Sequence, residues 1–318
     1  MTTVDLIKTN KNWRLNSMTN KNVWFKVVIF TILMGLLFSL NSGVMAKQSG
    51  EKVSRKKLNE NKRIVNDIAS SSDTILGEGV HLDHLKPEGD ISINWVSGGW
   101  NHTHQYLAAR AIVILENDKG STLANIFYNY GTTILENADW PDINERDGGT
   151  FKGHFYDPAT GLNYLSESSP TAKTRFVYWA NLATSYYYSD PQLSMQYLGR
   201  AMHYLADLNE THHAQNKIAV VTDHKEFEEW VDERRTDYMT TTTNKYNLDF
   251  GSSWSEICGK LADYAAENAD DWLFIINPIT FREYLFNSWD TVAADTMDWA
   301  QQTMSIFLYK FLEAVGEV

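Results

Sequence analysis

The fold class is decided by the stretch DPQLSMQYLGRAMHYLADLN, residues 190–209. Asp190 caps a predicted helix, and Pro191 follows at the first helical position, where its missing N–H costs no hydrogen bond. His203 and Asp207 are four residues apart, so a helix projects both from one face. That face points away from the apolar stripe formed by Leu198, Met202 and Leu205. The stretch therefore predicts a helix that packs by one side and offers a His/carboxylate pair from another.

Helical patterns continue on both sides of this stretch. From Ser288 to Val315, apolar side chains recur at steps of three and four residues, which is typical of a long amphipathic helix. Asp223 and Glu226 form a capping pattern for another helix, which we expect to reach about Tyr238. Further helices are expected over residues 103–117, 121–138, 171–188, 253–268 and 281–287. Because no stretch alternates like a strand over a useful length, the sequence predicts an all-α fold, a compact single-domain helical bundle with loops around residues 142–158 and 215–222.

The first 94 residues differ in composition from the rest. Basic residues precede the apolar run Val27–Leu40, which is followed by NSGVMA, residues 41–46. As a helix, this run reaches only about 21 Å, short of the roughly 30 Å hydrocarbon core of a membrane. We therefore predict a signal peptide over residues 1–46 and export from the cell. Residues 47–94 are polar and hold too few large apolar side chains to fold alone, which favours a pro-segment; a surface linker or stalk is the alternative.

The segment 95–318 is strongly acidic. From Trp95 onward, Asp and Glu outnumber Lys and Arg about two to one. Nucleic-acid binders need basic patches that displace counterions from phosphates, so nucleic acid is not an expected partner. The segment is long enough for one buried core and contains no stretch typical of a linker. We expect one domain, in a monomer.

A second His/carboxylate pair follows the first. His224 and Glu228 are again four residues apart in a predicted helix, and His213 lies between the two helices. Zinc prefers imidazole nitrogen and carboxylate oxygen, and its sites assemble three or four such groups. The two pairs and His213 are therefore candidate ligands of a multi-metal site. The alternative, from the residues alone, is that both pairs are ordinary solvated side chains.

Three upstream residues could extend such a site. His104 opens a predicted helix, Asp139 ends the next one, and His154 lies in the loop sequence GHFYDP. Each is weak evidence alone, because an Asp at a helix end is commonly a cap and a loop His is commonly exposed. The sequence has no Gly-x-Ser-x-Gly elbow, no phosphate-binding Gly-x-x-x-x-Gly-Lys-Ser/Thr loop and no His-Glu-x-x-His helix. These competing catalytic patterns are thus excluded.

Four stretches carry a resemblance to a known family. They are THQYLAARAI at 103–112, FKGHFYDP at 151–158, YLGRAMHYLADLN at 197–209 and HKEFEEWVD at 224–232. In order and spacing they resemble the bacterial zinc-dependent phospholipases C, the family of the Bacillus and Listeria phosphatidylcholine-preferring enzymes and of the catalytic half of clostridial alpha-toxin. The resemblance runs from Trp95 to about Val318. It implies a helical domain of the type shared by these phospholipases and P1 nuclease.

The resemblance also implies three zinc ions per chain. Trp95, as the mature N-terminus, would bind one ion through its free amino group and carbonyl oxygen, which explains a need for an activating protease that removes the pro-segment. Asp139 would also act as the general base or orient the attacking water. By resemblance, the three ligand sets are Trp95, His104 and Asp207; Asp139, His154, His203 and the shared Asp207; and His213, His224 and Glu228.

The implied activity is hydrolysis of the glycerol-side phosphodiester of membrane phospholipids to diacylglycerol and a phosphorylated headgroup. Trp140 and Phe151 are the aromatic residues against which a choline headgroup could lie, which makes phosphatidylcholine the expected substrate. Two departures stand out: residues 96–99, VSGG, lack the family's acidic residue after the Trp, and His212, which could compete as a ligand, replaces a large apolar residue. The alternatives are a zinc nuclease of the P1/S1 type and a non-catalytic zinc-binding surface protein.

Overall fold

The computed structural model describes residues 54–71 and 102–318. The predicted signal peptide, most of the predicted pro-segment and Trp95 lie outside these residues. The long helices are α2 (Arg55–Ser70), α3 (Thr103–Lys119), α4 (Ser121–Tyr128), α5 (Gly131–Asn144), α6 (Ala172–Tyr186), α7 (Pro191–Asp207), α9 (His224–Arg234), α10 (Trp254–Ala269) and α11 (Trp289–Val315). The shorter elements are α8 (Thr211–Ala214), the 3-10 turns Asp147–Gly149, Lys152–His154, Arg235–Tyr238 and Lys245–Asn247, and the strands β1 (Phe274–Ile276) and β2 (Glu283–Leu285).

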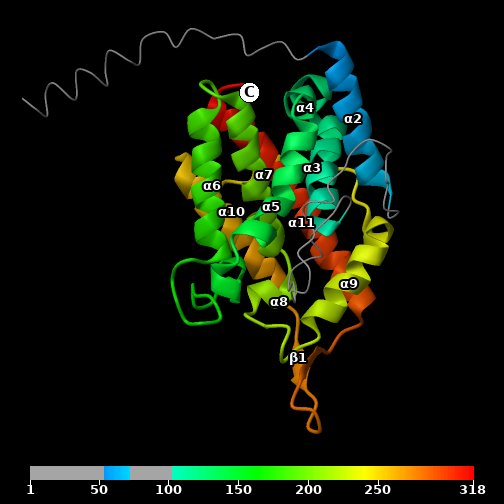
Figure 1. Ribbon diagram of the computed structural model, residues 1–318, viewed down its shortest axis with the longest axis vertical. Helices are drawn as coiled ribbons and strands as arrows, with labels where there is room; N and C mark the ends of the chain where they lie inside the picture. The colour runs from blue at the N-terminus through cyan, green and yellow to red at the C-terminus, as the bar shows by residue number, and fades with distance from the viewer. Residues whose placement is uncertain (1–53, 72–101) are drawn as a thin grey trace, which may run out of the picture. The chain divides into compact units, whose positions relative to one another are not determined.

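The helices pack side by side around one core (Figure 1). Helix α7 lies between α5 and α6, while α3 packs against α5 and α11, and α10 against α6 and α11. The predicted helical fold is confirmed. Asp190 caps α7 by accepting from the backbone N–H of Leu193, as its pattern predicts. No helix in the described part of the chain is long and apolar enough to span a lipid bilayer.

One of the predicted helices is found as two separate helices. The expected helix 121–138 breaks at Asn129 and Tyr130, so α4 ends and α5 begins in a new direction. The break lets the carbonyl of Asn129 accept a hydrogen bond from the Asn61 side chain at 2.9 Å instead of continuing the helix. Helix α5 then runs past Asp139 and includes Pro141 in its last turn, so Asp139 lies inside the helix and does not end it.

Helix α2 was not expected, because its segment is polar. Its apolar side chains are few but lie on one face, with Val65, Ile68 and Ala69 buried against α3, α4 and α5. Gly131 at the start of α5 faces this helix so closely that a β-carbon there would meet the Val65 side chain at 2.7 Å. A segment too polar to fold alone therefore forms a helix by packing on the rest of the chain.

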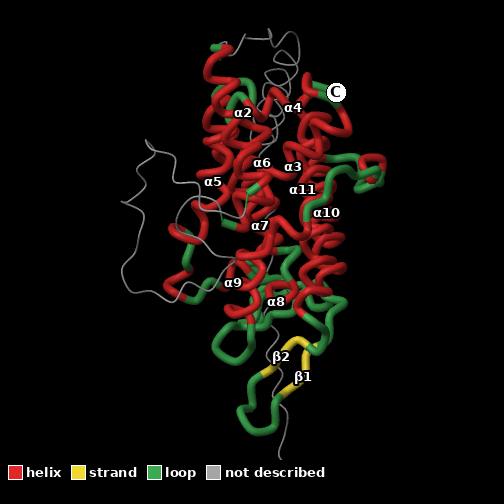
Figure 2. The backbone as a smooth tube through the Cα atoms, turned by 90° about the vertical axis from the view of Figure 1, so that its right-hand side faces the viewer, coloured by secondary structure: helices red, strands yellow, loops and turns green. Residues whose placement is uncertain are grey.

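The helix expected over 281–287 is wrong. Strands β1 and β2 pair antiparallel there, with Phe274 opposite Leu285 and Ile276 opposite Glu283. The connecting turn is built by Asn277, whose side-chain oxygen accepts from the backbone N–H groups of Ile279 and Thr280. Because the strands have only three residues each, they are too short to show the alternation that marks a strand. The hairpin extends away from the helices at the end where α8 and α9 lie (Figure 2).

Candidate metal centre

Five separate elements bring His and carboxylate side chains together at one end of the helices. They are the first turn of α3, the last turn of α5, the turn Lys152–His154, the last turn of α7, and the segment from α8 to the start of α9. Three groups have ligand atoms close enough to share a metal ion: His104, His203 and Asp207; Asp142, His154 and His203; and Glu210, His213, His224 and Glu228. All of these side chains are buried. The pairs that the sequence left open as solvated surface residues are thus inside the molecule.

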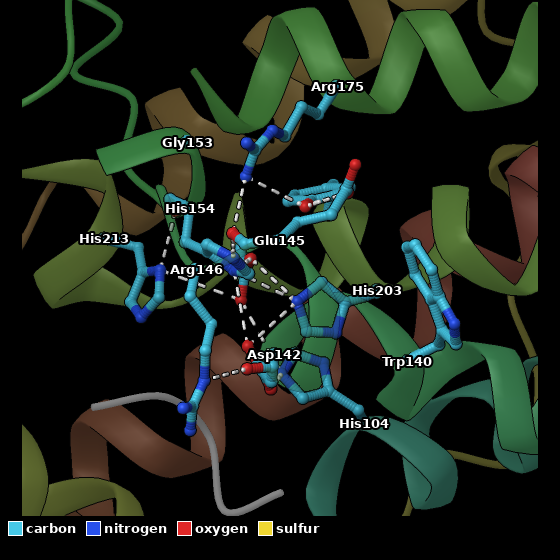
Figure 3. A network of polar contacts seen from close by, with 12 residues as sticks. His104, Trp140, Asp142, Glu145, Arg146, Gly153, His154, Arg175, His203 and His213 are labelled. Atoms are coloured by element: carbon cyan, nitrogen blue, oxygen red, sulfur yellow. Dashed lines mark hydrogen bonds and ion pairs between the residues drawn. The ribbon is translucent and has the colours of Figure 1, made fainter. Parts of the chain in front are cut away.

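The first two groups form one cluster, because His203 belongs to both (Figure 3). His203 Nε2 lies 3.3 Å from Asp142 Oδ1 and 3.3 Å from Asp207 Oδ2. His154 Nδ1 lies 3.4 Å from Asp142 Oδ1 and 3.0 Å from Asp207 Oδ2. His104 Nε2 lies 3.6 Å from an oxygen of each carboxylate. Two carboxylates therefore bridge three imidazoles.

Backbone carbonyls fix how these imidazoles point. His203 Nδ1 lies 2.8 Å from the carbonyl of Ala138, and His154 Nε2 lies 3.2 Å from that of Glu145. Since a carbonyl can only accept, each of these ring nitrogens donates, and the other nitrogen faces the carboxylates. This is the arrangement by which outer hydrogen bonds orient metal-binding histidines.

The charges in this cluster are strongly coupled. Burial raises the pKa of Asp142, but the neighbouring imidazoles of His203 and His104 outweigh it and lower that pKa to about 2. Burial lowers the pKa of His203, but Asp142 and Asp207 raise it well above its ordinary value. Burial, with His203 beside it, lowers the pKa of His104 to about 3. The protein therefore holds ionised carboxylates next to a neutral His104, and both forms are able to bind a metal ion.

The second cluster lies between α8 and α9. Glu228 Oε1 is 2.9 Å from His224 Nε2 and 3.4 Å from His213 Nε2. The other ring nitrogen of His213 lies 2.7 Å from the carbonyl of His154, which connects the two clusters. Burial raises the pKa of Glu228 to about 8, an effect that a bound cation would reverse.

Glu210 belongs to this cluster and was missed by the sequence reasoning. Its Oε2 lies 3.7 Å from His224 Nε2 and accepts from the backbone N–H of His213 at 2.8 Å, which caps α8. Burial raises the pKa of Glu210, but the imidazole of His212 outweighs it and lowers that pKa to about 2. The sequence does contain a signal for Glu210, which stands three residues before His213. A carboxylate at that spacing can cap a short helix, and it then lies close to His213.

His212 does not join the candidate metal groups. Its ring nitrogens lie 2.8 Å from Glu210 Oε1 and 3.2 Å from Asp223 Oδ1, and its ring stacks on that of His224 at 4.7 Å. Burial lowers the pKa of His212, but Glu210 and Asp223 outweigh it and raise that pKa to about 9. His212, which could have competed as a metal ligand, therefore orients the carboxylate of Glu210 instead.

Asp142, and not Asp139, is the α5 carboxylate that the structure brings into a group with His154 and His203. The two carboxylates are three residues apart, so one turn of α5 separates them. Asp139 is also buried, but it is in none of the three groups found among the described residues. Its role as ligand and general base stays a prediction from resemblance, whereas Asp142 lies 3.3–3.6 Å from three histidines.

The two aromatic residues expected at the headgroup already face protein cations. The guanidinium of Arg200 lies 3.7 Å from the ring centre of Trp140. That of Arg146 lies 5.6 Å from the ring centre of Phe151, which is itself buried and 5.8 Å from the ring of His154. Phe151 thus adjoins the cluster, but one face of each aromatic ring is covered by an arginine.

The donor atoms fit zinc. Two ligand atoms bound to one zinc ion at about 2.0–2.1 Å, with tetrahedral angles, lie about 3.3 Å apart. Four of the separations between His and carboxylate atoms, found in both clusters, are 3.3–3.4 Å. In addition, Asp207 Oδ1 and His213 Nε2 are buried and have no hydrogen-bond partner among the described residues. Burying polar atoms in this way is costly unless something else satisfies them, and a metal ion does so.

A helical domain whose buried imidazoles and carboxylates form groups that could hold several metal ions is typical of proteins that assemble zinc sites between helices. The family model for zinc-dependent phospholipase C matches residues 103–272, and the chain belongs to that family. This match includes the described ligand candidates from His104 to Glu228.

Curated relatives agree with this assignment, and a solved structure has a similar fold. A phospholipase C of Clostridium perfringens is 28% identical over 242 residues, covering 68% of this chain and 59% of that protein. A phospholipase C of Bacillus cereus is 27% identical over 208 residues, covering 62% and 66%. The chain thus spans roughly three fifths to two thirds of these relatives. The alpha-toxin of Clostridium absonum has the same fold, with a TM-score of 0.58, 24% identity and coverage of 71% of this chain and 66% of that one.

Proposed function

We propose that this protein is a zinc-dependent phospholipase C that hydrolyses the glycerol-side phosphodiester of phospholipids, with phosphatidylcholine as its first candidate substrate. Water would add to phosphorus, the glycerol oxygen would leave with a proton, and the products would be diacylglycerol and a phosphorylated headgroup. The observation that carries the proposal is the pair of buried clusters, which offer His and carboxylate donors at separations that suit zinc.

The proposal assigns three zinc ions. One would be held by Trp95, His104 and Asp207, with the Trp95 amino group freed by cleavage of the preceding bond. A second would be held by His154, His203 and Asp207 together with Asp142, which takes the place expected for Asp139. The third would be held by His213, His224 and Glu228, and Glu210 belongs to the same group of candidate ligands.

When bound, zinc supplies neutralisation of the phosphate oxygens and lowers the pKa of a coordinated water toward about 7. The chain's own residues prepare the site for this. Asp142 and Asp207 remain ionised because imidazoles surround them. The carbonyls of Ala138 and Glu145 hold the imidazoles of His203 and His154 in the orientation that faces the carboxylates. Asp142 Oδ1, which lies 3.3–3.4 Å from both imidazoles, would orient the attacking water in place of Asp139.

Headgroup preference is the finer part of the proposal. Arg200 and Arg146 each lie over one face of Trp140 and Phe151, so a choline ammonium would have to lie against the other faces. The proposed preference for choline therefore rests on the resemblance and not on an aromatic site that is already open. Comparing phosphatidylcholine with phosphatidylethanolamine under the same conditions tests it directly. We further propose that the protein is secreted and that a protease removes its pro-segment, as the composition of residues 1–94 indicates.

The test uses the chain that begins at Trp95, with its N-terminus verified by sequencing. We expect it to release diacylglycerol and phosphocholine from phosphatidylcholine vesicles, to lose this activity after chelation and to regain it with zinc. The matched control begins at Asn94, so that the nitrogen of Trp95 is an amide and cannot bind zinc as a free amine. That control should bind less zinc and release less product.

Two results would overturn the proposal. If the zinc-loaded chain leaves phospholipids intact but cleaves single-stranded nucleic acid, the protein is a nuclease of the P1/S1 type. If it binds zinc and cleaves neither substrate, it is a non-catalytic zinc-binding protein.

A further inference from the structure

The β1–β2 hairpin exposes a group of large apolar side chains. Ile279 is 86% exposed and Phe281 is 78% exposed, although free energy favours burying such residues. Contiguous exposed apolar surface of this kind marks a site of interaction with another molecule or with a membrane. We call this group the hairpin patch; its members are Leu273, Ile275, Ile276, Ile279, Phe281 and Phe286.

The hairpin patch is apolar on both sides of the ribbon. Ile275 and Ile276 are consecutive residues of β1, so their side chains point to opposite faces of the strand, and both are exposed. A hairpin that docked on another protein by one face would need only that face to be apolar. Exposure on both faces, together with an apolar tip, fits immersion in a soft apolar medium.

Strand β1 and the turn as far as Phe281 carry no charge. From Leu273 to Phe281 the sequence LFIINPITF contains no Asp, Glu, Lys or Arg. The first charges lie where the turn leads into β2, and both are paired: Arg282 with Glu226 and Glu283 with Lys217. No unpaired side-chain charge would therefore have to leave water if the tip entered an apolar phase.

The backbone of the tip is largely satisfied without water. The N–H of Asn277 donates to the carbonyl of Arg282, and the N–H of Phe281 donates to the carbonyl of Asn277, both at 2.8 Å. The Asn277 side-chain oxygen accepts from the N–H groups of Ile279 and Thr280. Since unpaired backbone groups are the main cost of placing a turn in lipid, this turn is suited to shallow insertion.

The hairpin is tied to the metal centre. The N–H of Glu283 donates to the carbonyl of Val221 at 2.8 Å, and the N–H of Leu285 donates to Asp223 Oδ2 at 3.4 Å. Asp223 is the residue before His224, a member of the second cluster. The ring of Phe274 lies 5.1 Å from that of His212, next to His213. A surface that binds the hairpin would therefore also keep the ligand candidates His213 and His224 close to it.

From these contacts we propose that the hairpin patch inserts into the surface of a phospholipid layer and holds the metal centre against it. Val220 and Val221, also exposed, lie beside the start of β2 and extend the apolar surface toward His224. This inference rests on the proposed function for its occupant, since the substrate of a phospholipase C is part of such a layer. Insertion is an interfacial contact of a short hairpin and not a membrane span.

The test separates docking from catalysis. The variant Ile279→Asp/Phe281→Asp places two charges at the tip, where each parent side chain is mostly exposed, so folding should be unaffected and is checked by its circular dichroism and Tm. The zinc-loaded chain that begins at Trp95 is mixed with vesicles of a phosphatidylcholine analogue whose glycerol–phosphate oxygen is replaced by methylene, and bound protein is sedimented. We expect vesicle affinity to fall at least about 100-fold.

A second measurement uses dibutyroyl phosphatidylcholine below its micelle concentration. Because this substrate needs no docking, kcat/KM on it should be the same for the variant and the parent, while hydrolysis of long-chain vesicles falls with their binding. The matched control is Val318→Asp, a comparably exposed apolar residue at the C-terminus, far from the hairpin (Figure 1). It should leave vesicle binding unchanged.

Each outcome decides the inference. Equal vesicle binding by the parent and the double variant overturns it, as does loss of binding in Val318→Asp. A parent that forms dimers in sedimentation equilibrium, while the double variant is monomeric and both bind vesicles alike, assigns the hairpin patch to a second copy of the chain instead. If neither substrate is hydrolysed but vesicle binding still depends on the hairpin, the proposed function fails and the docking surface stands.

Discussion

Asp139 and Asp142 differ by one turn of α5, and this difference decides which carboxylate serves the cluster. Asp142 has oxygens 3.3–3.6 Å from nitrogens of three histidines. Asp139 is buried nearby and is in none of the candidate groups of the described residues. The two side chains are chemically identical, so replacing each by its isosteric amide compares position alone.

We expect Asp142→Asn to lower activity by at least about 100-fold, since outer partners of metal ligands alone cost 10–100-fold. The variant should also bind less zinc, measured by mass spectrometry of the metal after gel filtration. Asp139→Asn should keep the zinc content of the parent and a larger share of its activity. If instead Asp139→Asn loses zinc and Asp142→Asn does not, the ligand is the one that the resemblance implied.

The sequence could predict the local pairs of the site but not its composition. His203/Asp207 and His224/Glu228 are visible because four-residue spacing in a helix is a local property. The choice of Asp142 over Asp139 depends on how far α5 continues past Pro141, and that is set by packing. Glu210 was hidden for a similar reason: its contact with His224 forms only when α8 and α9 are brought together.

At the scale of elements, helices α5 and α7 set the geometry of the first cluster. They approach so closely at Gly199 that a β-carbon there would lie 2.4 Å from the carbonyl oxygen of Ile134 and 2.8 Å from Asn137 Cβ. A backbone carbonyl inside a helix cannot move away as a flexible side chain can. Gly199 therefore fixes the distance between the helix that carries His203 and the helix that carries Asp142.

Gly199→Ala should push these two helices apart. We expect a loss of about 1–3 kcal/mol in the free energy of unfolding, from overpacking, measured by urea denaturation. Zinc content should fall as well, although residue 199 is not a ligand candidate. Gly259→Ala on α10 is the matched control, because no atom lies within 4 Å of its added carbon and alanine favours a helix by up to about 1 kcal/mol. Equal stability of the two variants would show that the close approach has no role.

Sequence periodicity predicted those helices whose own residues alternate between buried and exposed positions with the helical period. Helices α7, α10 and α11 carry apolar stripes and are found where expected. The hairpin escaped because its strands are three residues long, and α2 escaped because a mainly polar helix needs a partner surface to form. The break between α4 and α5 depends on Asn61, far away in sequence. These three features arise from tertiary contacts.

At the scale of the whole molecule, α2 lies within the segment proposed to be removed, yet it packs on the part that remains. Val65 and Ile68 are buried on that surface, the Ala69 carbonyl accepts from Arg110 Nη1 at 3.4 Å, and Lys62 pairs with Glu116. Burial of each aliphatic side chain contributes about 1.5–3 kcal/mol, an upper value because the unfolded chain also buries some surface. Cleavage at Asn94–Trp95 would cut the connection but leave these contacts in place.

We therefore expect the cleaved fragment to stay bound through α2. The full chain cut at Asn94–Trp95 should co-elute with its fragment and resist urea better than a chain expressed from Trp95, by about 2–4 kcal/mol in the free energy of unfolding. Adding a synthetic peptide of residues 50–71 should restore this difference, and the same peptide with Val65→Asp should not. Equal stability of the two preparations, with the fragment eluting separately, would mean that α2 leaves on cleavage and that the surface it covers in the uncut chain is open in the enzyme.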